Sequence, residues 1–456
     1  MVEDNEFGWQ SLPDVLLEDI FGLLSIKEKH IASQVCKHWF HIFYSSKVWA
    51  IFVLNDETLT KRKYNYYLGY ERTLDHYRTQ IFLNRVGHQL KKIIIKPMVN
   101  FFNLYEFMKI LSYFAEFYDQ NPLRKVNTFD FTFSCHQLLE RDGNQETVFG
   151  TGGKLLQSLM RLLRNLKGLL YLSLRDLLLE PSEAQYLLDD VAINCCQTLK
   201  SLTLLNCSKI LYPILHVGVF LNLKNLVISP QHLSDDIVVM LSDTKLQDLW
   251  IVQNKYTEYC QPISSKTWRS VSKHNPLMRI HLVVTGKVNS EIVWQESESV
   301  KSVIYDSPIF SMKSESLFII TSMYSSNLEH LAFHGLPRYH MSNKFSQRAD
   351  TSLVLLSQMC PNLKTLIIRE LISTATLLVI ITSAQQLTQF IVRKNAIIKR
   401  FDWKQQTDWS DHYYQWIKYN STSYERTFDE ISKIMGKKWL PLTDDEFKRI
   451  HPNNRF

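Results

Sequence analysis

Large apolar residues near the N-terminus recur at the spacing of an amphipathic helix. Between Leu12 and Trp49 they recur in two runs at near-helical spacing, the second at i, i+4, i+5, i+8, i+9 and i+12, which predicts a small helical module. The runs are Leu12, Leu16, Ile20, Phe21, Leu23 and Leu24, then Ile31, Val35, Cys36, Trp39, Phe40 and Phe43. About forty residues cannot bury so many large side chains, so some must contact the rest of the chain or a partner.

A different pattern, L-x-x-L-x-L, recurs in the rest of the chain and predicts short strands whose leucine positions face a core. Well-formed copies begin at Leu169, Leu199, Leu223, Leu246, Leu277, Val300, Leu328, Leu363 and Leu387, and degenerate copies begin at Leu90 and Val126. The starts from Leu169 advance by 30, 24, 23, 31, 23, 28, 35 and 24 residues. Leucine-rich repeats usually have 20–29 residues, so the spacing indicates an irregular solenoid.

Helix-like apolar segments separate these strands, at residues 181–196, 234–241, 315–323, 352–360 and 376–382. A strand–turn–helix unit cannot bury its apolar face alone and must stack on its neighbours. We therefore expect an α/β fold, with an N-terminal helical module, an irregular leucine-rich-repeat solenoid of short parallel strands plus helices, and a helical C-terminal cap. The expected domain bounds are 1–52, 53–88, 89–395 and 396–456, the second being a connector.

The leucine pattern stops after residue 395, where an aromatic segment begins. Residues 408–419 and 424–435 have helical spacing, and Gly436 is a plausible C-terminal stop. The last unit of a solenoid needs a cover for its apolar end, so capping is the favoured role. In the alternative, the tail folds across the concave face and contributes to partner binding.

Five tyrosines and several charged residues distinguish the expected connector. The tyrosines are Tyr64, Tyr66, Tyr67, Tyr70 and Tyr77. Aromatic and basic residues together can mark a site for single-stranded nucleic acid. Tyrosines at a domain junction usually pack, however, so we interpret the segment as a connector with one helix at residues 74–86.

Charge and cysteine usage exclude several classes of protein. The chain has 52 basic and 45 acidic residues, and the small excess is scattered, which does not favour a nucleic-acid partner. Its seven cysteines show no C-x-x-C pair and no zinc spacing. No apolar run approaches the length of a membrane-spanning helix, and the first ten residues lack a signal-peptide core. We expect a cytoplasmic or nuclear protein that contacts no membrane.

Motifs for catalysis and cofactor binding are absent from the sequence. There is no H-E-x-x-H, no G-x-S-x-G and no dinucleotide fingerprint. The glycines at residues 150–153 do not form a phosphate-binding loop, because Val148 and Leu155 occupy positions that need Gly and Ser or Thr. His330 and His334 are weak metal candidates. We expect a non-catalytic protein without a metal or cofactor.

The order LP-x-x-x-L, I-x-x-x-L, VC-x-x-W and a later Trp resembles the F-box family, although Glu28 stands where that family more often has Asp. The resemblance implies docking on the Skp adaptor of a cullin–RING ubiquitin ligase. The residues implied in docking are Leu12, Pro13, Leu16, Ile20 and Leu24, with Val35, Cys36, Trp39 and Trp49 between the adaptor contact and the core of the module. In the alternative, the module is a helical subdomain packed on the body of the chain. Residues 195–202 and 360–366 resemble the repeats of F-box leucine-rich-repeat proteins.

The resemblance implies a substrate-recognition subunit of an SCF-type ubiquitin ligase that binds an unknown protein substrate through its repeats. The alternatives are a non-degradative scaffold and a repeat protein unrelated to ubiquitin. Positions between the leucines should face the concave surface, where Trp250, with His281 beside it, is a candidate hot spot. The arginines just after the motifs could bind an acidic or phosphorylated segment; they are Arg175, Arg369 and Arg393. In the alternative, the tail covers this face and Trp250 belongs to the core.

Overall fold

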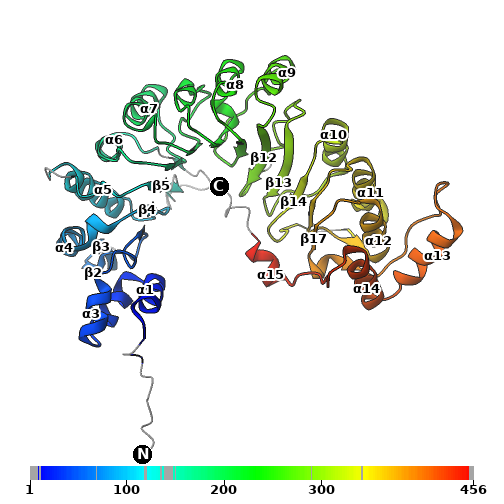
Figure 1. The fold of residues 1–456 in the computed structure, drawn as a ribbon, viewed down its shortest axis with the longest axis horizontal. Helices are drawn as coiled ribbons and strands as arrows, with labels where there is room; N and C mark the ends of the chain where they lie inside the picture. Colours follow the sequence, from blue (N-terminus) through cyan, green and yellow to red (C-terminus); the bar gives the residue numbers. More distant parts are fainter. Residues whose placement is uncertain are drawn as a thin grey trace, which may run out of the picture. The chain divides into compact units, whose positions relative to one another are not determined.

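A computed structural model describes residues 9, 12–67, 69–117, 121–133, 136–137, 147–148, 150–288, 290–339 and 342–450. Cys135 and most of the glycine-containing insert lie outside these residues. The chain divides into two compact units, Met1–Lys224 and Asn225–Phe456. In each unit short parallel strands alternate with helices (Figure 1), which confirms the α/β fold class.

The first unit begins with helices and continues as strand–helix repeats. Its helices are α1 (Asp14–Leu23), α2 (Ile26–Ala32), α3 (Lys37–Phe43), α4 (His76–Val86), α5 (Phe101–Glu116), α6 (Lys154–Asn165) and α7 (Pro181–Cys195). Its strands are β1 (Ile51–Leu54), β2 (Thr60–Asn65), β3 (Gly69–Leu74), β4 (Lys92–Ile95), β5 (Thr128–Thr132), β6 (His136–Gln137), β7 (Thr147–Val148), β8 (Tyr171–Arg175) and β9 (Ser201–Leu205). The parallel strands follow the order β1, β4, β5, β8 and β9.

The register of this sheet follows the leucine pattern. Phe129 of β5 lies opposite Leu172 of β8, which lies opposite Leu202 of β9, and all three side chains are buried. The expected connector, however, is not a simple linker. Strand β1 pairs with β4 and the hairpin β2–β3 follows it, so the sheet already begins near Ile51. The helix expected at residues 74–86 is α4.

The second unit contains the remaining repeats and the C-terminal segment. Its strands are β10 (Asn225–Ile228), β11 (Asp248–Gln253), β12 (Arg279–Thr285), β13 (Val300–Asp306), β14 (His330–Phe333), β15 (Thr365–Ile368), β16 (Ile372–Ser373), β17 (Gln389–Val392) and β18 (Ile397–Ile398). Its helices are α8 (Asp235–Ser242), α9 (Ser265–His274), α10 (Ser314–Tyr324), α11 (Asp350–Met359), α12 (Thr374–Ser383), α13 (Asp411–Asn420), α14 (Tyr424–Met435) and α15 (Asp444–Arg449). The parallel strands run in the order β10, β11, β12, β13, β14, β15 and β17.

One pair of strands departs from the register that the motif predicts. The pattern aligns Ile280 of β12 with Val303 of β13, but Val303 lies opposite Leu282 and Val300 lies opposite Ile280. The register also shifts by one residue between Ile280 and His281, where β13 has one extra residue. From His281 onward the pairing is displaced by two residues from the predicted alignment, so the apolar side chains of the two strands stay on the same face of the sheet.

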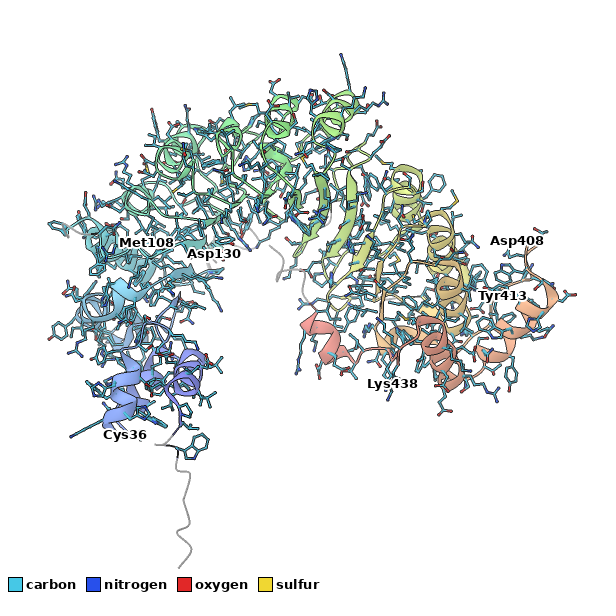
Figure 2. All side chains as sticks on the ribbon, viewed as in Figure 1. Cys36, Met108, Asp130, Asp408, Tyr413 and Lys438 are labelled. Atoms are coloured by element: carbon cyan, nitrogen blue, oxygen red, sulfur yellow. The ribbon has the colours of Figure 1, made fainter. Side chains whose placement is uncertain are left out.

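The last repeat is covered by the C-terminal helices. Every residue from Thr374 to Ile381 of α12 is buried. The hydroxyls of Thr382 and of Tyr413 on α13 (labelled in Figure 2) are hydrogen-bonded at 2.5 Å. Trp403 donates its indole N–H to Thr376 at 2.9 Å. Helix α14 ends at Gly436, whose φ of 65° is the left-handed conformation that glycine adopts without strain.

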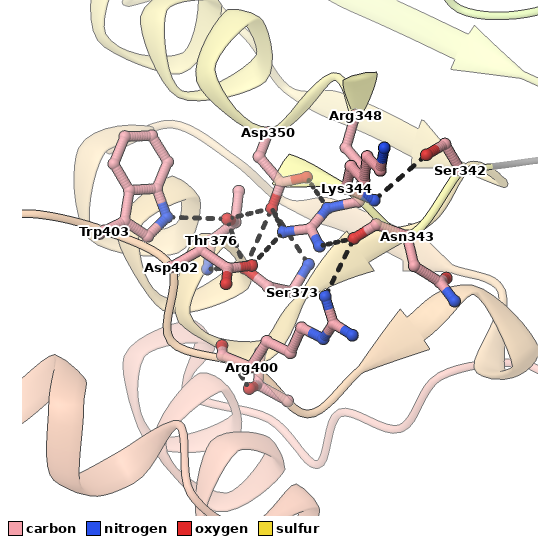
Figure 3. Close-up of polar contacts among 11 residues, drawn as sticks. Ser342, Asn343, Lys344, Arg348, Asp350, Ser373, Thr376, Arg400, Asp402 and Trp403 are labelled. Atoms are coloured by element: carbon pink, nitrogen blue, oxygen red, sulfur yellow. Dashed lines mark hydrogen bonds and ion pairs between the residues drawn. The ribbon is translucent and has the colours of Figure 1, made fainter. Parts of the chain in front are cut away.

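A buried polar cluster ties this end of the second unit together (Figure 3). Asp350 is fully buried and accepts hydrogen bonds from Arg348 at 2.8 Å and from the hydroxyls of Ser373 and Thr376. Arg348 also donates to Asp402 at 2.7 Å. The cluster therefore joins the start of α11, the start of α12 and the segment that leads to α13.

The described helices include none that is long and apolar enough to cross a membrane.

The strand register yields a stability test on one strand. Leu366 of β15 is fully buried, so Leu366→Ala should lower the free energy of unfolding by about 2–5 kcal/mol through the cavity it leaves. Lys364 is exposed and paired with Glu329, so Lys364→Ala should cost at most about 1 kcal/mol. Chemical denaturation of the three proteins measures both values. Equal losses would contradict the register.

Candidate functional site

The three N-terminal helices pack around a small core of their own. Leu17 and Phe21 of α1 and Ile42 of α3 are buried. The ring of Phe21 meets that of Trp39 edge to face, with 5.7 Å between centroids. These contacts fold α1 back on α3, and the opposite side of α1 is left in solvent.

Capping interactions set where α2 and α3 begin. Ser25 and Glu28 form a capping box, in which each side chain accepts a hydrogen bond from the backbone N–H of the other. Glu28, the residue that departs from the family pattern, therefore has a structural role. The thiol of Cys36 accepts a hydrogen bond from the backbone N–H of Trp39 at 3.4 Å and caps α3.

Trp49, which the family resemblance placed between the adaptor contact and the core of the module, lies in the core in this structure. Its side chain is 1% exposed, and its indole N–H donates to the carbonyl of Phe43 at 2.5 Å. Its ring packs edge to face on Phe43 and on Phe82 of α4. It can therefore not reach a partner in this structure, and it joins the helical module to the first repeat.

A buried lysine completes this junction. The ammonium of Lys29 lies 4.8 Å from the centre of the Trp49 ring and donates to the carbonyl of Val48 at 2.9 Å. Burial lowers the pKa of Lys29. Further hydrogen bonds, from Gln89 to the carbonyl of Tyr44 and from Arg85 to its hydroxyl, hold the module against α4 and the turn after it.

Apolar side chains are exposed on all three helices of the module and on the turn between α2 and α3. We call this set the exposed apolar surface; its members are Val15, Leu16, Ile20, Leu23, Ile31, Val35 and Phe40, all at least 40% exposed. Pro13 is also exposed, whereas Leu12, Leu24, Cys36 and Trp39 are half-buried. All candidates except Trp49 thus retain accessible surface. The candidate set did not include Val15, Leu23, Ile31 and Phe40, although all but Val15 belong to the helical runs.

Trp250 and His281 do not form an accessible hot spot. Their rings stack with 3.8 Å between centroids, and their side chains are only 8% and 6% exposed. The imidazole of His281 also lies 2.8 Å from the hydroxyl of Ser302 and 3.1 Å from a carboxylate oxygen of Asp248. The alternative reading, in which Trp250 is packed, describes the structure.

Arg369 is structural rather than ligand-binding. Its side chain is fully buried, and its guanidinium donates to the carbonyls of His334 and Phe310 and to the carboxylate of Glu370. Each of its three nitrogens therefore has a partner within the chain. The prediction that it accepts an acidic segment is wrong.

Arg393 is occupied by the C-terminal segment. It makes a bidentate ion pair with Asp444 of α15, at 2.7 and 3.1 Å, and this contact lowers the pKa of Asp444. The backbone N–H of Leu442 donates to the carbonyl of Val392 at the end of β17, and the imidazole of His334 lies 3.0 Å from the carbonyl of Ile450. The tail thus covers part of this face as well as the last repeat. Helix α15 was not expected, although the capping box of Thr443 and Glu446 is a sequence signal for it.

Arg175 is the remaining arginine among the candidates. It is half-buried at the end of β8, and it donates to the hydroxyl of Ser173 at 2.9 Å. This hydrogen-bond partner is neutral, whereas Arg369 and Arg393 each pair with a carboxylate.

The described residues offer little for metal or small-molecule chemistry. They include no group of three or more His, Cys, Asp or Glu side chains that could hold a metal ion. The described cysteines are free, and burial raises the pKa of Cys360 to about 12. A hollow of about 430 Å³ between α10 and α11 is lined mainly by apolar side chains such as Leu317, Phe318 and Leu355.

Residues 9–51 match the family described as the F-box domain. The chain is similar in structure to the crystal structure of the yeast Rad7 and Elc1 complex, at 13% identity and a TM-score of 0.40, covering 86% of this chain and 91% of that chain. It is also similar to a TLR13–ssRNA13 complex, at 15% identity and a TM-score of 0.32, covering 70% of this chain and 44% of that one. No curated protein matches the sequence. The chain thus carries an F-box domain at its N-terminus.

The buried Lys29 yields a pH-dependent stability prediction. Its pKa is lowered in the folded protein and has its ordinary value, 10.5, in the unfolded chain. As the pH rises through the folded pKa toward 10.5, the unfolded chain binds more protons, so the contribution of Lys29 to stability should increase.

The measurement compares the free energies of unfolding of the wild type and Lys29→Met from neutral pH to about pH 10. The difference should shift in favour of the wild type as the pH rises. Lys27→Met, on the exposed side of α2, controls for the loss of a lysine. A difference that does not change with pH would contradict the argument.

Proposed function

We propose that this chain is the substrate-recognition subunit of an SCF-type ubiquitin ligase and binds a Skp adaptor through its F-box domain. The observation that carries the proposal is the exposed apolar surface on α1, α2 and α3, within the residues that match the F-box family. Through the adaptor the chain would join a cullin and a RING subunit. Such a complex would act in the cytoplasm, the nucleus or both.

Burial within the module supports this orientation. On α1, Leu17 and Phe21 face the core, while Leu16 and Ile20 are 50% and 40% exposed on the other side. The core of the module buries only one apolar side of this short helix, so the second apolar side remains available to a partner. Covering exposed apolar surface is favourable by roughly 25 cal/mol per Å², so a partner that buries this side gains free energy.

A receptor of this kind needs no catalytic group. Holding a substrate next to a ubiquitin-charged enzyme raises the effective concentration of its lysines and converts an encounter between molecules into a step within one complex. We propose that the leucine-rich repeats bind the protein substrate, with Arg175 as the candidate contact on the sheet. In the alternative function, the chain binds the adaptor as a scaffold and delivers no protein for degradation.

The first test removes the exposed apolar surface without disturbing the core. Leu16→Ala with Ile20→Ala should weaken adaptor binding by about 2–4 kcal/mol, because both side chains would be central to a helical interface. Calorimetry with purified Skp adaptor under reducing conditions measures the loss. The matched control is Ile193→Ala on α7, which removes a 78% exposed isoleucine outside the module. If the double variant bound the adaptor as tightly as the control does, the docking surface would lie elsewhere.

The second test separates a substrate receptor from a scaffold. In cells that contain the wild-type chain, blocking the proteasome should raise the abundance of the captured proteins. In cells that contain only the Leu16→Ala, Ile20→Ala variant, blocking the proteasome should cause no such rise, although that variant still captures the proteins. Arg175→Glu should reduce capture while leaving adaptor binding unchanged. Captured proteins whose abundance depends on neither the proteasome nor the F-box domain would favour the scaffold.

A further inference from the structure

The hairpin β2–β3 has a face that the adaptor-binding function does not use. Among the described residues its two strands form a sheet of their own, and β3 contacts α5 in the first unit (Figure 1). The antiparallel register places Arg62 opposite Arg72 and Tyr64 opposite Tyr70. Since these positions alternate along each strand, all four side chains are on one face. We call them the Arg–Tyr face.

The Arg–Tyr face is open to solvent and carries an uncompensated charge. Tyr64 and Tyr70 are 61% and 79% exposed, and both arginines are exposed as well. Arg72 pairs with Glu57 at 2.7 Å, but Arg62 has no ion-pair partner in the part of the chain that the structure describes. Like charges directly opposite each other destabilise a hairpin, so the fold gains nothing from this pair.

The hairpin is anchored at its base, which presents the Arg–Tyr face on a fixed support. Asn103 of α5 accepts from the backbone N–H of Leu74 at 2.7 Å and donates to the carbonyl of Arg72 at 2.9 Å. Asn100 also donates to the carbonyl of Arg72. A two-stranded hairpin alone is marginally stable, and these bonds to the start of α5, where Asn103 is buried, compensate for that. The binding of a partner therefore does not have to order the base of the hairpin.

We propose that the Arg–Tyr face binds an acidic segment of a partner protein. Guanidinium groups pair with carboxylates in a bidentate manner, so a carboxylate near Arg62 and Arg72 would replace the repulsion between them with two attractions. Tyrosine and arginine are also the residue types that carry binding energy at protein interfaces. The charges of this face match an acidic partner and repel a basic one.

The geometry of the tyrosines favours a protein partner over single-stranded nucleic acid. Tyr64 and Tyr70 meet edge to face, with 5.2 Å between centroids and 67° between planes. Tyr66 and Tyr67 at the tip are also edge to face, at 86°. Bases stack on aromatic rings that present free faces along a strand. Here the two rings of each pair pack edge to face against each other, so these four tyrosines do not form a series of stacking platforms.

Adjacent residues of β2 give a charge-matched test on opposite faces. Arg62 is on the Arg–Tyr face, whereas Lys63, also exposed, is on the other face opposite Glu71. The full chain is titrated into a fluorescein-labelled oligoglutamate peptide, and binding is followed by anisotropy. Arg62→Gln should weaken binding roughly tenfold and Lys63→Gln less than about twofold, because only the first removes a donor from this face. Arg62→Gln also removes a like-charge pair, so thermal stability should not fall.

Three results would overturn the proposal. They are a wild-type chain that does not bind the peptide, equal weakening by Arg62→Gln and Lys63→Gln, and an oligothymidine that binds more tightly and displaces the peptide. The second result would indicate diffuse attraction by net charge, and the third would indicate a nucleic-acid surface. Adaptor binding by both variants should match the wild type, so a failure of this proposal is distinguishable from a failure of the proposed function.

Discussion

The packing of the N-terminal helices on the rest of the first unit depends on the buried side chain of Trp49. Its ring packs between Phe43 of α3 and Phe82 of α4, and Phe82 packs in turn on Phe52 of β1, which stacks on Phe107 of α5. This series of aromatic contacts runs from the F-box domain into the first repeats. Because the rings are buried on both sides of the junction, the domain is fixed to the repeats within the first unit. A docked adaptor would therefore have a defined orientation toward that unit.

The leucine pattern predicts most of the sheet because its period has a direct physical meaning. Side chains alternate between the two faces of a strand, so each L-x-x-L-x-L copy states which positions enter the core, as Leu172 and Leu202 do. The pattern does not reveal the displaced pairing of β12 and β13, since a displacement of two residues preserves the alternation. It also missed that β1 belongs to the sheet, because the segment that follows is polar and tyrosine-rich and hides the short apolar strand.

The candidate site was less predictable, because periodicity identifies amphipathic segments but does not identify what covers each face. The neighbouring residues Leu16 and Leu17 of α1 differ in burial: Leu16 is exposed and Leu17 is buried. Only the packing of α3 against α1 decides which of the two is buried. On the sheet, the motif placed Arg369 opposite the leucine core, but the loop at Phe310 supplies a carbonyl that holds it. Such contacts come from segments distant in sequence, and no local pattern records them.

Arginines in this chain differ in function because they differ in what already satisfies them. Arg369 and Arg348 are buried with carbonyl and carboxylate partners, so a ligand would have to replace hydrogen bonds that the protein already makes. Breaking a buried pair leaves a charge without a partner and costs several kcal/mol, roughly 3–5 in measured cases. Arg62 makes no buried pair that a ligand would have to break, since it is exposed and lies opposite another arginine. An acidic partner would therefore gain more free energy at Arg62 on the hairpin than at the buried arginines of the second unit.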